Sequence, residues 1–391
     1  MTFLDFFAGI GGLRVGMEKA GHTCLGFCEK DKYATASYTS MHLITELQRK
    51  ELKHLSLKKR QNEILKEEYR NGEWYVDNIK TVRAKDLPKV DVWCFGSPCT
   101  SFSLAGKRKG LEGESGLIQE IFRLLRETRE EDRPEWLIYE NVKGMFSSNR
   151  GYDYLAVLTA MDELGYDAEW QLVNSKDFGV PHNRERVYTI GHFRGKGRKH
   201  ILPLERTNGT GRNGLDAHCV GGLGKKTSNG GRQYYQQDRI YDGTTVATSL
   251  CANLPSVDGM KSNMYLIPVE ISGRNVRIKQ DIAHCLNAND QRKVFGAKQI
   301  RTMVGIEAKQ KYQGEYIKLP FGDNLYAKWF DKYDAYFIIR RLTPKECFRL
   351  QGFSDELYKK AEFVNTPSQL WKQAGNSVTV NIVYEIAKAL Y

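Results

Sequence analysis

The sequence lacks the cysteine pattern of a disulfide-rich or zinc-binding protein. Its eight cysteines form no CxxC pair and show no spacing suited to a metal site. This usage is typical of reduced thiols inside a cell, so we expect a cytoplasmic protein that binds no metal. The eight residues are Cys24, Cys28, Cys94, Cys99, Cys219, Cys251, Cys285 and Cys347.

Long apolar runs are also missing. No run reaches the roughly 20 residues that a membrane-spanning helix needs, and the N-terminus has neither the basic region nor the cleavage site of a signal peptide. Acidic residues are fewer than basic ones, 47 against 59, which leaves a net charge of +12. A basic chain without a membrane signal favours a polyanionic partner such as nucleic acid.

The positive charge is concentrated in residues 194–232. This segment holds nine Lys or Arg residues against two acids, together with ten glycines. Glycines at this density favour loops and turns over a helix. We interpret the segment as basic loops that settle on phosphates, with a solvated linker as the alternative.

Residues 1–193 alternate short apolar segments with segments of helical periodicity. This alternation predicts an α/β fold with a doubly wound, mostly parallel sheet and with ligands at the carboxyl edge of the strands. The predicted strands are Thr2–Phe7, Thr23–Cys28, Val90–Phe95, Trp136–Tyr139 and Arg186–His192. Helical spacing appears in two groups, one formed by Leu117, Ile121, Leu124 and Leu125, and one by Tyr154, Val157, Leu158 and Met161.

The rest of the chain predicts a second, smaller domain rich in strands and loops. Helical periodicity fades after about residue 194, and Ala247–Asn253 is weakly echoed by Ala283–Asn289. Order returns where Thr343 caps a helix that has Pro344 at its first position. We therefore divide the chain into a catalytic part (1–193, with an inserted helical surface element at about 42–75), a small domain (194–367), and a C-terminal segment (368–391) that returns to the first part.

Three chemically active groups lie at the edges of predicted strands. Cys99 lies on a loop after the apolar run Val90–Phe95, and Pro98 stiffens the backbone before it. A lone cysteine is usually a small buried hydrophobe, but Glu140 follows the next apolar run, and Arg184 and Arg186 precede a third. A nucleophile, an acid and two guanidinium groups at strand ends predict a catalytic site.

The first strand leads into a glycine turn, Asp5-Phe6-Phe7-Ala8-Gly9-Ile10-Gly11-Gly12. Its glycines allow close approach of a ligand, and Glu29 ends the second strand, where a carboxylate can accept hydrogen bonds from ribose hydroxyls. The sequence has no GxxxxGK[ST] motif for phosphates. The pocket therefore suits an adenosine without phosphates, on whose base Phe7 is expected to stack.

These motifs, in this order, resemble the cytosine-5 DNA methyltransferases that use S-adenosylmethionine. The resemblance spans the whole chain and rests on the glycine turn, Glu29, Gly96–Cys99 with Phe102–Arg108, Gly116-Leu117, Glu140–Val142, Arg184–Arg186 and Gly375–Val378. It implies a Rossmann-like class I methyltransferase fold with a target-recognition domain. The cofactor-binding residues it implies are Phe7, Ala8, Gly9, Ile10, Gly11, Gly12, Glu29, Lys30, Asn78, Ile79, Pro98, Leu117, Asn376 and Ser377.

Three positions depart from the family's usual pattern. Thr100 follows the nucleophile where Gln is usual, and His182 replaces a common Gln before the two arginines. Asn78 stands where the family usually has an Asp for the adenine amino group, and its carbonyl can accept the same hydrogen bond. The departures concern substrate contacts and leave the nucleophile and the acid in place.

The resemblance implies methylation of C5 of a cytosine flipped out of double-stranded DNA. Cys99 would add to C6, Glu140 would contact N3, Arg186 would hold O2, and Arg184 would fix the loop or the acid. S-adenosylhomocysteine would be the product. The expected protein is a monomer, nucleoid-associated when on DNA, and any restriction endonuclease would act separately. Expected DNA contacts are Ser101, Lys107, Arg108, Lys225 and Lys226.

Three alternatives remain open at this stage. The same scaffold serves RNA methylation, including that of transfer RNA, although the large variable region favours sequence readout on DNA. A non-catalytic DNA-binding regulator would not need Cys99, Glu140 and Arg186 together. A uridylate-methylating type of enzyme shares the addition to C6 but has no use for a basic, glycine-rich domain.

Overall fold

The computed structural model describes residues 1–97, 114–197, 199–206 and 342–391, and between 207 and 341 it describes the backbone of strands β9 to β17. In these parts of the chain, no helix is long and apolar enough to cross a membrane. The same parts contain no cluster of three or more His, Cys, Asp or Glu side chains that suits a metal ion.

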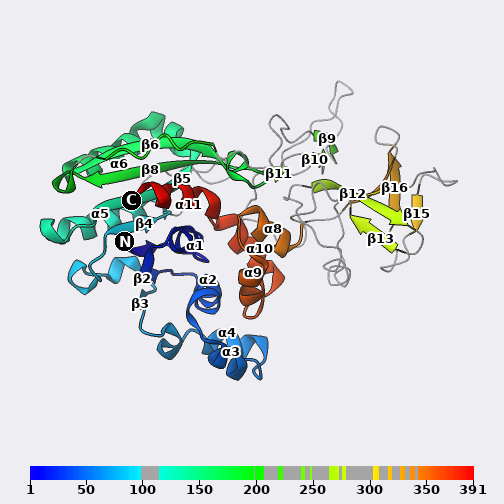
Figure 1. The fold of residues 1–391 in the computed structure, drawn as a ribbon, viewed down its shortest axis with the longest axis horizontal. Coiled ribbons are helices and arrows are strands. Elements are labelled where there is room, and N and C mark those ends of the chain that lie inside the picture. Colours follow the sequence, from blue (N-terminus) through cyan, green and yellow to red (C-terminus); the bar gives the residue numbers. More distant parts are fainter. Residues whose placement is uncertain are drawn as a thin grey trace.

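A seven-stranded sheet organises the first part of the chain, in the order β3-β2-β1-β4-β5-β8-β6 (Figure 1). The four neighbouring pairs from β3 to β5 are parallel, and β8 runs antiparallel to both β5 and β6. The predicted doubly wound, mostly parallel sheet is confirmed. The strands are β1 (Thr2–Phe6), β2 (Thr23–Cys28), β3 (Trp74–Val76), β4 (Val92–Phe95), β5 (Trp136–Val142), β6 (Tyr166–Asn174) and β8 (Glu185–Phe193).

The strands differ from the prediction in three places. Strand β5 continues to Val142, so Glu140 lies inside the strand rather than after it. Strands β3 and β6 were not predicted. Residues 166–172 alternate apolar and polar residues strictly, which is the signal of a half-buried strand and was missed for β6.

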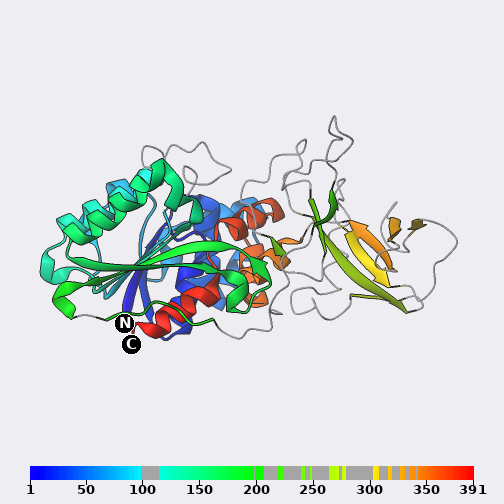
Figure 2. The same cartoon turned by 90° about the horizontal axis from the view of Figure 1, so that it is seen from above.

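Helices cover both faces of this sheet (Figure 2). The two predicted helical segments form α5 and α6, and the Thr343 cap on α8 is confirmed, with Pro344 at the first turn. The helices are α1 (Gly12–Lys19), α2 (Lys32–Tyr38), α3 (Glu46–Leu52), α4 (Leu57–Glu63), α5 (Ile118–Glu127), α6 (Tyr152–Glu163), α8 (Pro344–Leu350), α9 (Asp355–Glu362), α10 (Pro367–Asn376) and α11 (Val380–Ala389).

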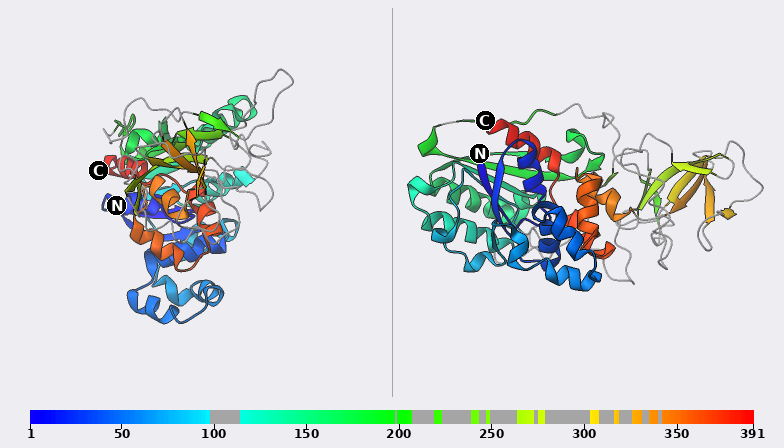
Figure 3. Two further views of the ribbon diagram at one scale, coloured as in Figure 1. Left: turned by 90° about the vertical axis from the view of Figure 1, so that its right-hand side faces the viewer. Right: turned by 60° about the horizontal axis from the view of Figure 1, so that its bottom comes forward.

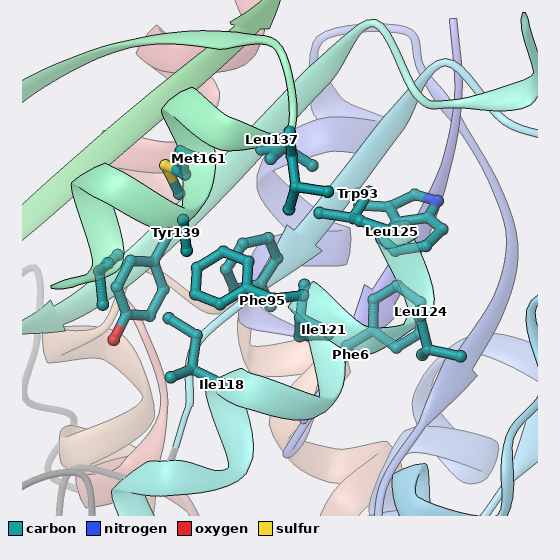
Figure 4. Close-up of a cluster of buried hydrophobic side chains, with 14 of the residues drawn as sticks. Phe6, Trp93, Phe95, Ile118, Ile121, Leu124, Leu125, Leu137, Tyr139 and Met161 are labelled. Carbon is teal, nitrogen blue, oxygen red and sulfur yellow. The ribbon is translucent and has the colours of Figure 1, made fainter. Parts of the chain in front are cut away.

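Alternate side chains of the central strands build two cores. On β4, Trp93 and Phe95 pack with α5 and α6, a cluster that Figure 4 shows around Ile121. Val92 and Cys94 point the other way, into a core shared with α1 and α11. Because successive residues of a strand face opposite sides, both faces must be apolar in a sheet covered on both sides.

The C-terminal helices complete the first part. Helix α11 packs along α1, and the two chain ends lie close together (Figure 3). Helices α8, α9 and α10 share a core with Ile10 and Met41. Helices α8 and α9, which the predicted division places in the small domain, thus share a core with residues of the first part of the chain.

The predicted insertion at 42–75 forms α3, α4 and short turns, and it protrudes from the sheet (Figure 3). It is not purely a solvated element. Leu52, Ile64 and Tyr69 form a small core with Val364, and Arg60 lies 4.0 Å from the ring of Phe363. The insertion thus braces the end of α9.

Residues 207–341 contain a second, eight-stranded sheet, as predicted for a strand-rich second domain. A separate two-residue strand, β11, pairs with β7 (His182–Asn183), which directly precedes Arg184 in the chain. Strand β11 belongs to the first copy of the sequence echo, and the second copy lies outside the described residues. The strands are β9 (Cys219–Gly222), β10 (Arg239–Asp242), β11 (Ala247–Thr248), β12 (Met264–Ser272), β13 (Asn275–Ile278), β14 (Met303–Glu307), β15 (Tyr316–Lys318), β16 (Tyr326–Phe330) and β17 (Ala335–Ile339).

The contact between α1 and α11 depends on Gly16. A Cβ at this position would lie 2.5 Å from Cβ of Val383, and only separation of the helices relieves this clash. We expect Gly16→Ala to lower the free energy of unfolding by about 1–3 kcal/mol, although alanine is intrinsically the better helix former. Urea unfolding measures the change. Lys19→Ala, on the exposed side of α1, is the control, and an equal effect of both substitutions would contradict the prediction.

Candidate active site

Glu140 and Arg186 meet at the carboxyl edge of β5. Because β8 runs antiparallel to β5, its first residues lie beside the last residues of β5, and Val142 pairs with Arg186. The Nε atom of Arg186 lies 3.0 Å from Oε1 of Glu140, and both side chains are largely buried. Nη1 of Arg186 donates to the carbonyl of Glu185 at 2.7 Å, which orients the guanidinium group. The predicted acid and one predicted arginine thus form an ion pair.

The chain that leads to Cys99 passes directly against this acid. Gly96 follows β4, and a Cβ built on it would lie 3.2 Å from Oε2 of Glu140. A larger residue at Gly96 would press on the carboxylate. The last described residues before Pro98 therefore run beside the acid, although Pro98 and Cys99 themselves lie outside the described residues.

A buried hydrogen-bond network ties this segment to β5. Nδ2 of Asn141 donates to the hydroxyl of Tyr139 at 2.6 Å and to Oγ of Ser97 at 3.2 Å, and the two hydroxyl groups lie 3.1 Å apart. All three side chains are at most 4% exposed. Burial raises the pKa of Tyr139, so its hydroxyl stays protonated. Sequence reasoning missed Ser97 and Tyr139, because a strand pattern assigns Tyr139 only to the core.

The predicted ribose carboxylate, Glu29, is held by two main-chain amides. Its Oε2 accepts from the amide of Gly9 at 2.8 Å, and its Oε1 accepts from the amide of Asp31 at 2.7 Å. Burial raises the pKa of Glu29, while these amide donors act in the opposite direction. The carboxylate therefore has a defined orientation before any ligand arrives.

The glycine turn has the backbone that its sequence predicts. Gly9 and Gly11 have φ values of 58° and 81°, and Phe7 adopts a φ of 56°, which is rare for an aromatic residue. A Cβ at Gly9 would have no described atom within 4 Å, whereas one at Gly12 would lie 2.7 Å from Oγ of Ser377. The turn thus packs closely on one side and faces open space on the other. Such a cradle, with Glu29 beside it, fits a nucleoside.

The other predicted cofactor residues differ in their burial and in their hydrogen bonds. Ile10 and Ile79 are buried core residues, so their side chains support the pocket from behind. Oδ1 of Asn78 accepts from the amide of Lys80 at 3.2 Å, which uses part of its acceptor capacity. Ser377 is buried beside the glycine turn, as stated above. The remaining predicted residues are Ala8, which is buried, Leu117, which is partly buried, and Lys30 and Asn376, which are exposed.

Sequence reasoning also missed His42, which holds the glycine turn from behind. It lies in a short π-helix, η1 (Thr39–Leu43), that continues α2. Its Nε2 lies 3.0 Å from the carbonyl of Ile10, which can only accept, so Nε2 carries the proton. Burial lowers the pKa of His42 to about 3, and the charge of Arg14 acts in the same direction. His42 is therefore a neutral donor at physiological pH.

The second predicted arginine, Arg184, has different partners from Arg186. It is 3% exposed and donates to the carbonyls of Gly375 and Ser377, at 3.2 and 2.7 Å. The residue that departs from the family pattern, His182, is fully buried, and burial lowers its pKa well below the usual value. The structure therefore connects Arg184 with the C-terminal segment.

The remaining predicted site residues lie outside the described residues. They are Pro98, Cys99, Thr100, Ser101, Lys107, Arg108, Lys225 and Lys226.

Comparison with known proteins gives one consistent family. A family model for C-5 cytosine-specific DNA methylase matches residues 1–391. The orphan methyltransferase M.SPRI of Bacillus phage SPR is 28% identical over 100% of this chain and 97% of its own length. The type II methyltransferase M.HhaI of Haemophilus parahaemolyticus is 27% identical over 99% of this chain and 93% of its own.

Solved structures support the fold. The methyltransferase EhMeth of Entamoeba histolytica has a TM-score of 0.55 at 16% identity, and the match covers 100% of this chain and 97% of that one. The Dnmt2 methyltransferase of S. pombe has the same TM-score and identity and is covered over 98% of its length. The class I methyltransferase fold implied by the sequence is confirmed.

We expect His42→Leu to weaken S-adenosylmethionine binding about tenfold, because one hydrogen bond to the glycine turn is lost. His42→Gln keeps a donor and should recover most of the affinity; calorimetry without DNA measures both. Because the folded-state pKa of His42 lies below its unfolded value, its contribution to stability is complete above about pH 6.5 and is lost as the pH falls toward 3. His42→Gln should remove this loss. Equal affinities of the wild type and His42→Leu would contradict the assignment.

Proposed function

The chain belongs to the C-5 cytosine-specific DNA methylases, and we propose that it methylates C5 of a cytosine flipped out of a specific double-stranded DNA sequence through a covalent adduct of Cys99. The observation that carries this proposal is the ion pair of Glu140 and Arg186 at 3.0 Å, beside the segment that leads to Cys99. An acid and a guanidinium group at this edge match the N3 and O2 atoms that a flipped cytosine offers.

The proposed reaction begins with the thiolate of Cys99, which adds to C6 and makes C5 nucleophilic. Glu140 donates a hydrogen bond or a proton to N3, where negative charge would otherwise develop. Arg186 binds O2, while its pairing with Glu140 keeps both groups oriented. Loss of the C5 proton to a base then expels the thiolate of Cys99, the N3 proton returns to Glu140, and the aromatic ring is restored.

The proposed cofactor is S-adenosylmethionine, which supplies the methyl group that C5 receives. Phe7 stacks on the adenine, and Glu29 binds the ribose hydroxyls with a carboxylate that Gly9 and Asp31 already orient. The turn from Gly9 to Gly12 gives the close approach that the nucleoside needs. Ser377 closes the opposite side through its contact with Gly12.

Cys99→Ser should abolish methyl transfer and leave binding of cofactor and DNA nearly intact, because a hydroxyl is far less ionised than a thiol at neutral pH. Tritium transfer from labelled S-adenosylmethionine to duplex DNA and to RNA measures activity and identifies the polymer. Cys94→Ala, in the buried core of β4, is the control and should stay active. Activity of Cys99→Ser within about tenfold of the wild type would exclude Cys99 as the nucleophile. Preferred labelling of RNA would exclude DNA as the substrate.

A trapping experiment tests the adduct itself. With DNA that carries 5-fluorocytosine, the fluorine cannot leave as a proton does, so the covalent intermediate should accumulate. We expect a complex stable to denaturant in the wild type and in Cys94→Ala, only with S-adenosylmethionine present, and none in Cys99→Ser.

We also propose that residues 194–335 select the methylated sequence. They carry the concentrated positive charge and a separate sheet, and β11 pairs with β7, which directly precedes Arg184. Phosphate contacts there should give affinity that falls steeply with salt, and base contacts should give roughly 1–3 kcal/mol of discrimination each. We propose that the protein acts as a monomer, with any restriction endonuclease acting separately.

Transplanting residues 194–335 from a relative should change the methylated sequence, as read by bisulfite sequencing of host DNA. Neutralising Lys225 and Lys226 should weaken binding to all DNA and leave the motif unchanged, because phosphate contacts carry no sequence information. An active chimaera that keeps the parent motif would show that specificity lies elsewhere.

A further inference from the structure

The end of α10 forms one wall of the cofactor site. Gly375 and Asn376, the last two residues of the helix, and Ser377, its C-cap, form what we call the α10 turn. A Cβ built on Gly12 would lie only 2.7 Å from Oγ of Ser377, so the turn packs directly on the glycine loop. A shift of the turn would therefore alter the shape of the cradle for the nucleoside.

The α10 turn carries main-chain carbonyls that the helix itself leaves without partners. The last carbonyls of any helix lack intrahelical donors, and the partial negative charge there favours a cation. Arg184 supplies that cation, with Nη1 3.2 Å from the carbonyl of Gly375 and Nη2 2.7 Å from that of Ser377. Gln351 adds a donor to Ser377 at 3.4 Å and one to Ala374 at 2.8 Å.

The backbone of Arg184 is fixed as firmly as its side chain. Its amide donates to the carbonyl of His182 at 2.9 Å and to Oδ1 of Asn174 at 3.1 Å. Its carbonyl accepts from the amide of Ser175 at 3.0 Å. The guanidinium group therefore projects from a rigid base between β6 and β8, so it can hold the α10 turn in place.

Arg184 and Arg186 thus act at two different sites, the cofactor pocket and the base pocket. Arg186 pairs with the acid of the base pocket, and Arg184, two residues earlier, clamps the wall of the cofactor pocket. We propose that Arg184 is a positioning residue for cofactor binding and does not contact the cytosine. This assignment rests on the proposed function, because it presumes that the glycine loop binds S-adenosylmethionine.

The assignment makes Arg184 a physical link between the two substrates. Arg184 directly precedes β8, the strand that presents Arg186 to the base, so fixing the backbone at either site helps to fix it at the other. By linkage, cofactor and DNA should each raise the affinity for the other by the same factor. Loss of the clamp should reduce that factor.

The test uses S-adenosylmethionine binding to the full-length protein without DNA. Arg184→Met removes both charge-assisted hydrogen bonds and keeps the length of the side chain, so the Kd should rise at least about tenfold. Arg184→Lys keeps the charge and one donor, and its Kd should lie between those of the wild type and Arg184→Met. In turnover, the KM for the cofactor should rise more than kcat falls.

Two control variants separate this role from general stability and from base contact. Arg133 also donates to two main-chain carbonyls, those of Leu125 and Leu164, but next to the start of β5, at the opposite edge of the sheet. Arg133→Met should lower the melting temperature and leave the Kd for the cofactor unchanged. Arg186→Lys should reduce kcat and also leave that Kd unchanged.

The outcomes distinguish this assignment from the proposed function. If the wild type does not bind S-adenosylmethionine, the proposed function itself fails. If the wild type binds but the Kd of Arg184→Met stays within twofold, or if Arg133→Met weakens binding equally, the positioning role is wrong. If Arg184→Met does not fold, Arg184→Lys decides, because a Kd equal to that of the wild type with a fall in kcat would assign Arg184 to the base.

Discussion

The antiparallel pairing of β8 with β5 is the constraint on which the site depends. A parallel strand in this place would bring Arg184 and Arg186 to the amino edge of the sheet, far from Glu140. The reversed direction places the start of β8 beside the end of β5, with Val142 opposite Arg186. Strand β4 ends at the same edge, and the buried network of Ser97, Tyr139 and Asn141 ties its continuation to β5.

The cofactor pocket is built by segments that lie far apart in the sequence. The glycine turn is held in front by Glu29, behind by His42 and on its side by Ser377. Its wall depends on the C-terminal helices, of which α11 packs on α1 and α9 packs on α2. The carbonyls at the end of α10 give Arg184 its proposed role on the cofactor side of the site.

Much of the architecture was predictable because it follows from local patterns. Apolar runs located β1, β2 and β4, helical periodicity located α5 and α6, and Thr343 with Pro344 marked the start of α8. The extension of β5 through Glu140 was missed, because a charged residue inside a strand gives no apolar signal. The roles of His42 and Tyr139 were not predictable either, since each depends on a partner brought near only by folding.

The sequence by itself determined which residues are candidates for the chemistry proposed here: a cysteine, an acid and two arginines near predicted strands, a glycine turn with its carboxylate, and a concentrated positive charge. These signals can be read from the sequence because each depends only on residue type and on neighbours in the chain. The tertiary structure decided the partners. In the folded chain, Arg186 pairs with Glu140. Arg184 donates to the carbonyls of Gly375 and Ser377, which lie 191 and 193 residues further along the sequence. Strand direction and helix packing determine these pairings, and neither can be predicted from the spacing of the residues along the chain.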